Sequence, residues 1–343
     1  MGAPFPFAAI VGQDELKLAL LAVAIDPSIG GVLIFGDRGT GKSTAVRALS
    51  ALLPSMKVLA GCRYGCDPAQ PASWCSECQA RPARRRPAVR TVAVPVVDMP
   101  LGATEDRVVG ALNLEQALSS GVRSFEPGLL AQANRGFLYI DEVNLLEDHL
   151  VDLLIDVAAS GQNVVEREGL SVRHPARFVL VGSGNPEEGE LRPQLLDRFG
   201  LSVEIRTPQE IDLRVEIVRR RDQFERDPEA FLKAWRGEQQ KLQNAVIKAR
   251  ERLAKVEVGH DALRWATRLC MRVGTDGLRG ELTMIRAARA LAALSGNGSV
   301  GAAELARVAA VALRHRLRRD PLDETGSSLR IERAISEQGT SLA

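Results

Sequence analysis

One octapeptide near the N-terminus constrains this chain more than any other feature: Gly36-Asp37-Arg38-Gly39-Thr40-Gly41-Lys42-Ser43. It fits the phosphate-binding pattern GxxxxGK[ST] in full. The apolar run 31–35 precedes it and the helix-like segment 44–49 follows it, so a buried strand is predicted to turn directly into a helix. Such a turn directs several backbone N–H groups and the positive end of a helix at one point, where a phosphate chain can bind. The segment therefore predicts a nucleoside triphosphate site.

The residue types in this loop suit separate tasks. Glycines let the backbone approach the phosphates, Lys42 neutralises charge on the β- and γ-phosphates, and the Ser43 hydroxyl can bind Mg²⁺. The alternative is a chance glycine-rich turn, which the strand before it and the helix after it disfavour. The candidate nucleotide-binding residues are Gly36, Asp37, Arg38, Gly39, Thr40, Gly41, Lys42 and Ser43.

Composition is typical of a soluble enzyme. The chain has 343 residues, 45% of them hydrophobic, and a chain of this length holds about two or three domains. No apolar run approaches the roughly 18 residues of a membrane span, and the first residues lack the regions of a secretory signal. The net charge of +2, from 45 basic and 43 acidic residues, does not favour a nucleic-acid binder. We therefore expect a cytoplasmic protein with no membrane span and no nucleic-acid partner.

A pair of carboxylates forms the second signal. Asp141 and Glu142 follow the apolar run 137–140, which is typical of a buried strand. In open parallel sheets ligands bind at the carboxyl ends of the strands, so both acids are expected to face the phosphates. Asp141 would hold Mg²⁺ and Glu142 would polarise the attacking water. The alternative is an acidic helix N-terminus in which Asp141 caps the following residues.

Two further polar residues follow downstream. A third predicted strand, 177–182, leads to Asn185, which could hydrogen-bond the γ-phosphate or the water; Asn185-Pro186 could also simply start a turn. A short helix over 191–199 ends near Arg198. That arginine could reach the γ-phosphate of a neighbouring protomer, or form an ion pair with its own surface.

Four of the five cysteines form two close pairs. Cys62 and Cys66 are separated by three residues, and Cys75 and Cys78 by two. Such spacing can place four thiolates around Zn²⁺, and CxxC pairs also undergo thiol–disulfide exchange. A zinc site, a redox-sensitive pair and an inert insertion all remain open. The fifth, Cys270, is expected to be a core residue.

The last third of the chain has a helical pattern. Helices are predicted over 208–222, 227–258, 260–273, 279–294 and 300–317. The long charged segment 227–258 is either an arm that meets a partner or a solvated helix. The basic run 314–319 could be a partner surface, but we expect an exposed helix end whose positive charge suits the helix dipole.

The motifs together resemble those of a known family. The phosphate loop, acidic strand end, Asn-Pro strand end and Leu-Leu-Asp-Arg-Phe helix occur in the order found in the AAA+ ATPases. Several strings resemble, more narrowly, the magnesium chelatase ATPase subunit I family, over nearly the whole chain except roughly residues 61–90. These strings occupy positions 10–13, 36–43, 105–110, 125–130, 141–146, 182–189 and 276–282.

The resemblance implies a role for each candidate residue. Lys42 and Ser43 would be the Walker A ligands, with Ser43 and Asp141 holding the Mg²⁺ of MgATP. Glu142 would be the catalytic base. The remaining roles would be sensor 1 for Asn185, an arginine finger acting across a protomer boundary for Arg198, and sensor 2 for Arg279.

The resemblance also implies a fold of the α/β class, an AAA+ P-loop core with a parallel sheet flanked by helices and a C-terminal helical bundle. The core would span 1–220, the linker arm 221–256 and the helical lid 257–343. Within the core we expect a cysteine-containing insertion at 61–90, a helix-2 insert at 92–125 and a β-hairpin at 160–178, which its turn pattern predicts independently. The segment 8–13 would lie beside the adenine.

By resemblance, the protein would be the ATP-hydrolysing motor of magnesium chelatase, a homo-oligomeric ring expected to be a hexamer. It would act directly with the D component of the chelatase, and through the complex with the porphyrin-binding H component, to insert Mg²⁺ into protoporphyrin IX in (bacterio)chlorophyll synthesis. The alternatives are an AAA+ subunit of cobaltochelatase or a MoxR-like chaperone. A DNA motor is disfavoured by the mixed charge of the turn 166–169, and a non-catalytic switch by the presence of Glu142 and Arg198.

Overall fold

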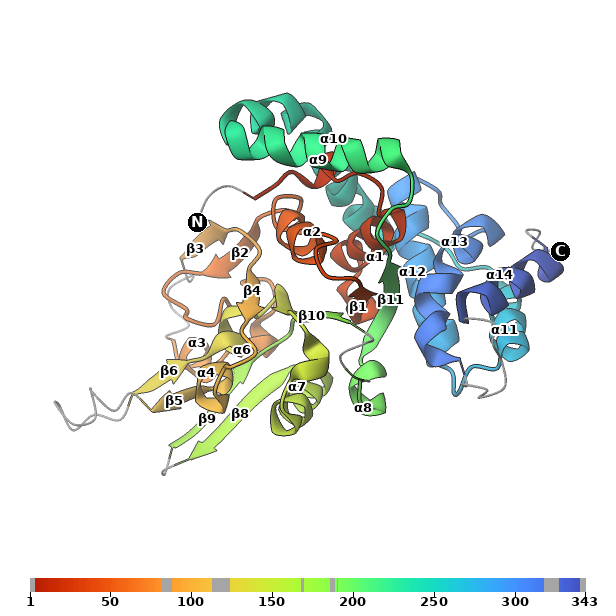
Figure 1. Cartoon of the computed structure of the whole chain (residues 1–343). Coiled ribbons are helices and arrows are strands. Elements are labelled where there is room, and N and C mark those ends of the chain that lie inside the picture. Colours follow the sequence, from red (N-terminus) through yellow and green to blue (C-terminus); the bar gives the residue numbers. More distant parts are fainter. Residues whose placement is uncertain are drawn as a thin grey trace. The chain divides into compact units, whose positions relative to one another are not determined.

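The structure, a computed structural model, describes residues 4–81, 88–112, 124–167, 170–185, 189, 191–317 and 327–339 (Figure 1). The chain divides into two compact units that alternate along the sequence. The first unit consists of Met1–Leu53, Gly184–Pro186 and Phe199–Ala343. The second consists of Pro54–Ser183 and Glu187–Arg198.

The first unit is built on two parallel strands. Strand β1 (Gly31–Gly36) pairs with β11 (Phe199–Ile205), with Ile34 opposite Val203. The first four residues of β1 are buried, as expected for a parallel strand covered on both faces, which therefore appears in the sequence as a continuous apolar run. Helix α1 (Asp14–Ile25) packs against both strands, and α13 (Ala302–Leu313) packs against β11. The phosphate-binding loop thus leaves a rigid, largely buried strand.

The helical region that follows is rich in small apolar residues. Helix α12 (Arg279–Ser295) contacts α1, α10 (Pro228–Leu253), α11 (His260–Val273) and α13. Its buried face includes Ala287, Ala288 and Leu291. Small side chains allow helices to pack closely, and α11 to α14 lie together in Figure 1. The remaining helices of this unit are α2 (Lys42–Leu49), α9 (Ile211–Arg226) and α14 (Ser327–Gln338), with 3-10 turns η1 (Phe7–Ala9), η2 (Pro27–Ile29) and η6 (Arg314–Arg316).

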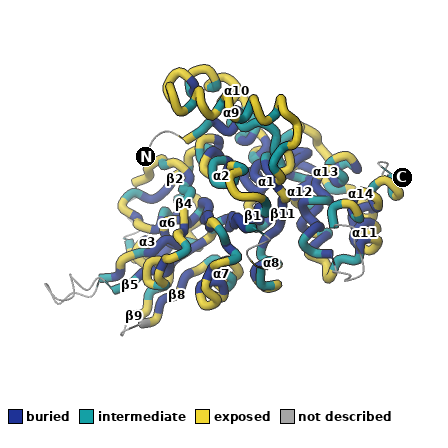
Figure 2. Tube along the Cα trace, viewed as in Figure 1, coloured by how far each residue is buried: buried dark blue, intermediate teal, exposed yellow. Residues whose placement is uncertain are grey.

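Helices α9 and α10 form the charged arm region and are largely exposed along their length (Figure 2). Asp227 separates them, because its carboxylate caps α10 by accepting a hydrogen bond from the Ala230 N–H (2.9 Å). The rings of Phe224 and Phe231 lie 5.7 Å apart across this junction. The expected boundary between core and arm at 220/221 lies inside α9, and the division into core, arm and lid stays a prediction.

The second unit contains three parallel strands in the order β10–β7–β4. The central strand β7 is buried at every position, and Phe137 pairs with Val179 on one side and with Val96 on the other. The other strands described in this unit form three antiparallel pairs, β2–β3, β5–β6 and β8–β9. Its elements are β2 (Met56–Leu59), η3 (Pro71–Ser73), α3 (Ser76–Gln79), β3 (Val89–Val92), β4 (Val96–Met99), α4 (Glu105–Val109), β5 (Gly110–Leu112), β6 (Phe125–Pro127), α6 (Leu129–Gln132), β7 (Phe137–Ile140), η4 (Val143–Leu145), α7 (Asp148–Ser160), β8 (Gln162–Arg167), β9 (Leu170–Pro175), β10 (Val179–Gly184) and α8 (Pro193–Leu196).

The expectation that residues 314–319 form an exposed helix end is wrong for residues 314–316, and 318–319 lie outside the described residues. The Arg314 side chain is 6% exposed and binds both carboxylate oxygens of Glu15, at 2.9 and 3.1 Å. His315 Nε2 and Arg316 Nη2 both bond the carbonyl oxygen of Phe199, at 3.0 and 2.8 Å. A buried carbonyl requires a donor, so this basic run fastens α13 to β11 and α1 instead of facing solvent.

In the described part of the chain, no helix has the length and apolar character needed to cross a membrane.

Strands β8 and β9 pair within the segment 160–178, which was expected to form a β-hairpin. The turn residues 168–169 lie outside the described residues.

Candidate nucleotide site and cysteine cluster

The phosphate-binding loop connects β1 to α2, as its sequence predicts. Gly39 (φ 77°) and Gly41 (φ 81°) have left-handed backbone conformations, which favour glycine. A side chain at Gly36 would overlap the carbonyl oxygen of Ile205 on β11. Helix α2 begins at Lys42, so its first backbone N–H groups have no carbonyl partner within the helix and point out of its N-terminus.

Side-chain hydrogen bonds within the first unit hold this loop. Thr40 Oγ1 donates to the Asp37 carbonyl (2.9 Å), and Gln13 Nε2 donates to the Thr40 carbonyl (2.6 Å). Thr207 Oγ1, which follows β11, donates to Asp37 Oδ2 (3.1 Å). The Lys42 ammonium lies across the loop, 2.5 Å from the Gly36 carbonyl oxygen. The loop is therefore fixed in shape by groups from three separate segments, and its lysine is already placed over it.

A cavity of about 850 Å³ adjoins the loop and fits the size range of a small-molecule site. Apolar side chains of Ile10, Val11 and Ile217 contribute to its lining, which suits the flat face of a base. Gln13 Oε1 is buried here and accepts no hydrogen bond from the residues that the structure describes, so a bound ligand could donate to it. The lining comes from the N-terminal segment, the phosphate loop, the end of β11 and helix α9.

The acidic pair stands at the carboxyl end of β7. Asp141 Oδ1 accepts hydrogen bonds from the buried Tyr139 hydroxyl (2.9 Å) and the buried Ser183 hydroxyl. The Ser183 oxygen also accepts from the Glu142 N–H (3.4 Å). Glu142 has φ 52°, a left-handed conformation that costs a residue with a side chain about 1 to 3 kcal/mol and is commonest at functional sites. The structure therefore brings Asp141 and Glu142 together on a braced strand end.

The other three candidates occupy different places. Asn185 directly follows β10 and is half-buried. Arg198 lies two residues after α8, and its guanidinium makes no hydrogen bond or ion pair with any described residue. Arg192, at the other end of α8, is instead paired with Asp148 on α7. Arg279 is exposed at the first residue of α12. Burial, with a smaller effect from the Arg279 charge, lowers the pKa of Arg316 to about 10, so two cationic groups are close together there.

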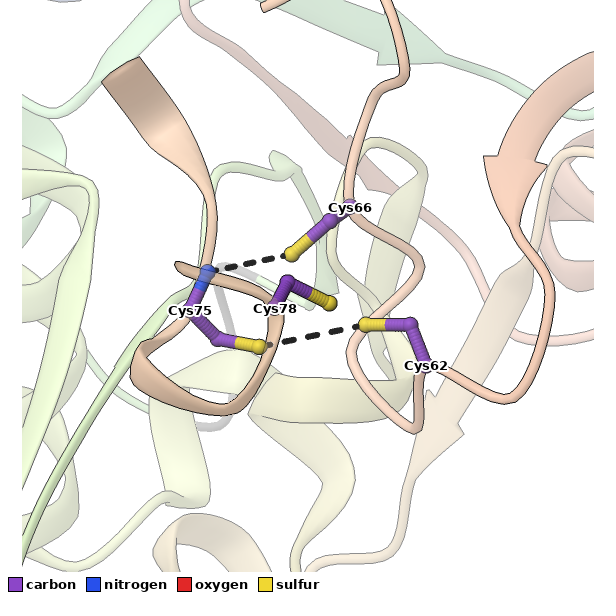
Figure 3. Close-up of side chains that lie close together, drawn as sticks. All are labelled: Cys62, Cys66, Cys75 and Cys78. Carbon is purple, nitrogen blue, oxygen red and sulfur yellow. Dashed lines mark hydrogen bonds between the residues drawn. The ribbon is translucent and has the colours of Figure 1, made fainter. Parts of the chain in front are cut away.

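The four paired cysteines converge in the second unit (Figure 3). All four are buried and none forms a disulfide with another described cysteine, and they form a small hydrophobic cluster with Leu59 and Tyr64. Hydrogen bonds from neighbouring thiols hold the pKa of Cys62 far below its usual range. Burial raises the pKa of Cys78 to about 12. Cys270 lies apart, in α11, as a buried core residue.

Sequence reasoning missed Tyr139, Ser183 and the contribution of α9 to the cavity. The available signals were a tyrosine hydroxyl within the otherwise apolar run 137–140 and a serine, Ser183, near the end of the predicted strand before Asn185. For α9, which contributes Ile217 and Val218 to the cavity, the sequence carries no signal of a site.

Comparisons with known proteins agree with this architecture. A family model described as the AAA lid domain matches residues 264–335, and one described as magnesium chelatase, subunit ChlI, matches residues 113–194. A crystal structure of a candidate ATPase from Cytophaga hutchinsonii shares 16% sequence identity, with a TM-score of 0.65 over 95% of this chain and 90% of that one. At this identity the likeness concerns the fold alone. Parallel strands with a phosphate-binding loop, followed by AAA lid helices, define the class of AAA+ ATPases, whose ligands are ATP and Mg²⁺.

Closer relatives define the family. The magnesium-chelatase 38 kDa subunit of Acidiphilium rubrum is 64% identical over 97% of both chains. That of Rhodobacter capsulatus is 61% identical over 97% of this chain and 93% of its own. A cryo-EM-based structure of the complex between subunits BchI and BchD of magnesium chelatase contains a chain 60% identical, with a TM-score of 0.53 over 92% of this chain and 97% of that one. The chain therefore belongs to the magnesium chelatase subunit I family.

Proposed function

We propose that this chain is the ATP-hydrolysing motor subunit of magnesium chelatase, which drives the insertion of Mg²⁺ into protoporphyrin IX in (bacterio)chlorophyll synthesis. The observation that carries the proposal is the braced phosphate-binding loop beside a cavity of about 850 Å³. Because the chain is closely identical to a magnesium-chelatase subunit, we assign ATP hydrolysis at this site to magnesium chelation. The inserted Mg²⁺ is substrate and is distinct from the ion that accompanies ATP.

Nucleotide binding is the task of the first unit. The backbone of Gly39 to Ser43 surrounds the phosphates, and Lys42 leaves its carbonyl contacts to neutralise them. Ser43 and Asp141 would hold the nucleotide's Mg²⁺, which when bound neutralises charge that develops on the phosphates. Asp141 suits this because the hydrogen bonds from the Tyr139 and Ser183 hydroxyls within the described part of the chain both go to Oδ1 and leave Oδ2 for the ion.

Hydrolysis requires an oriented water molecule and stabilisation of the transition state. Glu142 acts as the base that orients and polarises the water, with its backbone held by Ser183. Asn185 and Arg279 act as the two sensor residues that contact the γ-phosphate or the water. The roles of these residues follow from the family resemblance of the segments that contain them.

Assembly completes the site. In this proposal Arg198 is the arginine finger that acts on the site of the neighbouring protomer. The role suits Arg198 because its guanidinium has no partner among the described residues of its own chain. The protomers form a homo-oligomeric ring, a hexamer, in the cytoplasm, which binds the D component directly and the H component through the complex. ATP turnover then supplies the work of insertion, since Mg²⁺ loses its bound water reluctantly.

The test is magnesium insertion into protoporphyrin, followed by fluorescence, with purified D and H components and MgATP. We expect insertion to require this chain and to disappear with Glu142→Gln, which should still bind ATP. Hydrolysis of ATP without insertion, in the presence of well-matched partners, would leave an AAA+ motor of another kind, such as a cobaltochelatase subunit or a MoxR-like chaperone.

A further inference from the structure

The four cysteines of the second unit are arranged more closely than packing requires. Their sulfur atoms all lie within 4.8 Å of one another. Figure 3 shows Cys62 and Cys66, from one loop, pointing toward Cys75, just before helix α3, and Cys78, within that helix. Each side chain is at most 3% exposed. Convergence of four buried thiols from two loops distinguishes this cluster from an isolated reactive cysteine.

The separation between two of the sulfur atoms is close to that expected around a metal ion. Cys62 Sγ and Cys75 Sγ are 3.9 Å apart, whereas a disulfide bond measures about 2.0 Å. Zinc–sulfur bonds of about 2.3 Å in a tetrahedron place neighbouring sulfurs roughly 3.8 Å apart. A polynuclear iron–sulfur cluster would hold its thiolates farther apart, outside its own metal atoms. The observed spacing therefore fits a single tetrahedral ion.

The surrounding backbone also fits a metal site. Gly61 (φ 71°) and Gly65 (φ 65°) flank the first loop and allow it to turn back tightly between Cys62 and Cys66. The Cys75 N–H donates to Cys66 Sγ (3.2 Å), a bond that stabilises a thiolate ligand. Helix α3 starts directly after Cys75 and so brings Cys78 to the same side.

We propose that Cys62, Cys66, Cys75 and Cys78 bind one structural Zn²⁺ ion per chain. Four cysteine ligands fill the coordination sphere of zinc, which is the arrangement of structural and not of catalytic sites. The ion takes no part in ATP hydrolysis, and the inference stands independently of the proposed chelatase function.

Residues beside the ligands indicate what the ion stabilises. The Tyr64 ring stacks on His174 of strand β9, with ring centroids 4.6 Å apart. Arg63 donates to the Phe125 carbonyl of β6 (2.7 Å). Two hairpins, β5–β6 and β8–β9, thus rest on the loop between Cys62 and Cys66. Zinc fixes this loop and, through it, the bases of both hairpins.

The experiment measures metal in the purified full-length chain, expressed with zinc and then freed of loosely bound metal. We expect one zinc per chain, and four sulfurs at about 2.3 Å by X-ray absorption. The double variant Cys75→Ser/Cys78→Ser should lose the zinc, whereas the control Cys270→Ser, which removes a buried thiol elsewhere, should retain it. Because the double variant could misfold, the wild-type chain is also loaded with Co²⁺, which should give the intense visible bands of tetrahedral thiolate coordination.

A second measurement tests the structural role. Removal of zinc from the wild-type chain by a chelator should increase hydrogen exchange in residues 162–165 and 172–175 and leave α12 unchanged. The proposal is overturned if the zinc-exposed chain holds no stoichiometric metal. In that case two disulfides found by mass spectrometry would identify a redox pair, and four thiols alkylated in the native state would identify an inert cluster.

Discussion

Asp141 is held in place by two buried hydroxyl groups, those of Tyr139 and Ser183. Neither hydroxyl is expected to touch ATP, so in the proposed mechanism both would act on the reaction through the carboxylate that they orient. Groups of this kind commonly change metal affinity or activity by about 10- to 100-fold when removed. Ser183 also contacts the N–H of Glu142 and so connects the two acids.

We expect Ser183→Ala to lower kcat for ATP hydrolysis by about 10- to 100-fold and to raise the Mg²⁺ concentration needed for half-maximal activity. The measurement is steady-state hydrolysis at varied Mg²⁺. Ser160→Ala is the matched control, since its hydroxyl bonds the carbonyl groups of Val157 and Gln162, away from the acids. Equal kinetics of the two variants would show that Ser183 does not position Asp141.

The half-buried His315 makes the stability of the chain depend on pH. Burial and the adjacent Arg316 lower the pKa of His315 to about 3, below the roughly 6.5 of an unfolded histidine. The unfolded chain therefore takes up the proton first, and stability that is complete above pH 6.5 is lost as the pH falls toward 3. Between pH 7 and pH 5 the loss should be about 2 kcal/mol.

His315→Gln removes this titration and can retain a donor to the Phe199 carbonyl. We expect urea unfolding of this variant to show a smaller loss of stability between pH 7 and pH 5 than the wild-type chain. His149→Asn, which removes an exposed histidine, is the control substitution. If the free energy of unfolding of His315→Gln fell as steeply with pH as that of the wild-type chain, the pH dependence could not be assigned to His315.

At the scale of elements, helix α1 is joined to the 3-10 turn η6, which directly follows α13, by the ion pair between Glu15 and Arg314. The pair is asymmetric, because the Arg314 side chain is 6% exposed and that of Glu15 is 47% exposed. Removing the carboxylate leaves a buried charge without its partner, whereas removing the guanidinium leaves a carboxylate that water can reach.

We therefore expect Glu15→Ala to destabilise the chain by about 2 to 3 kcal/mol and Arg314→Met by about 1 kcal/mol. The measurement is the free energy of unfolding in urea, with Asp14→Ala as a control whose exposed pair with Lys17 should contribute less than about 1 kcal/mol. A double variant should resemble Arg314→Met. If Arg314→Met destabilised the chain more than Glu15→Ala, the argument that an unpaired buried charge is the larger cost would be refuted.

At the scale of the whole molecule, the proposed ring divides each catalytic site between two protomers. Glu142 would act within one protomer and Arg198 would act on its neighbour, so the two residues need not come from the same chain.

Variants Glu142→Gln and Arg198→Ala should each be nearly inactive alone and recover activity when mixed. In an equal random mixture about a quarter of the sites combine an intact Glu142 with an intact Arg198 from the neighbour. ATP hydrolysis in the mixture, above the sum of the separate variants, is the measurement. If activity stays at that sum although mixed oligomers form, Arg198 does not act across a protomer boundary.

The motifs of this chain could be read from its sequence because each depends on neighbouring residues. The order of apolar strand, glycine-rich loop and helix predicts the turn from β1 to Lys42, which the structure confirms. The run 137–140 likewise predicts the strand that ends at Asp141. Spacing indicates that four cysteines can meet, since both pairs lie in short loops. Local conformation and side-chain chemistry set all these features.

Only tertiary structure decides the contacts between residues distant in sequence. Ser183 reaches Asp141 across 42 positions, and Arg314 reaches Glu15 across 299. The cavity beside the phosphate loop likewise needs α9, whose apolar residues carry no marker of a site. A basic run such as 314–316 is equally compatible with solvent or with a buried carbonyl. The buried polar groups that packing leaves in need of partners determine which of the two occurs.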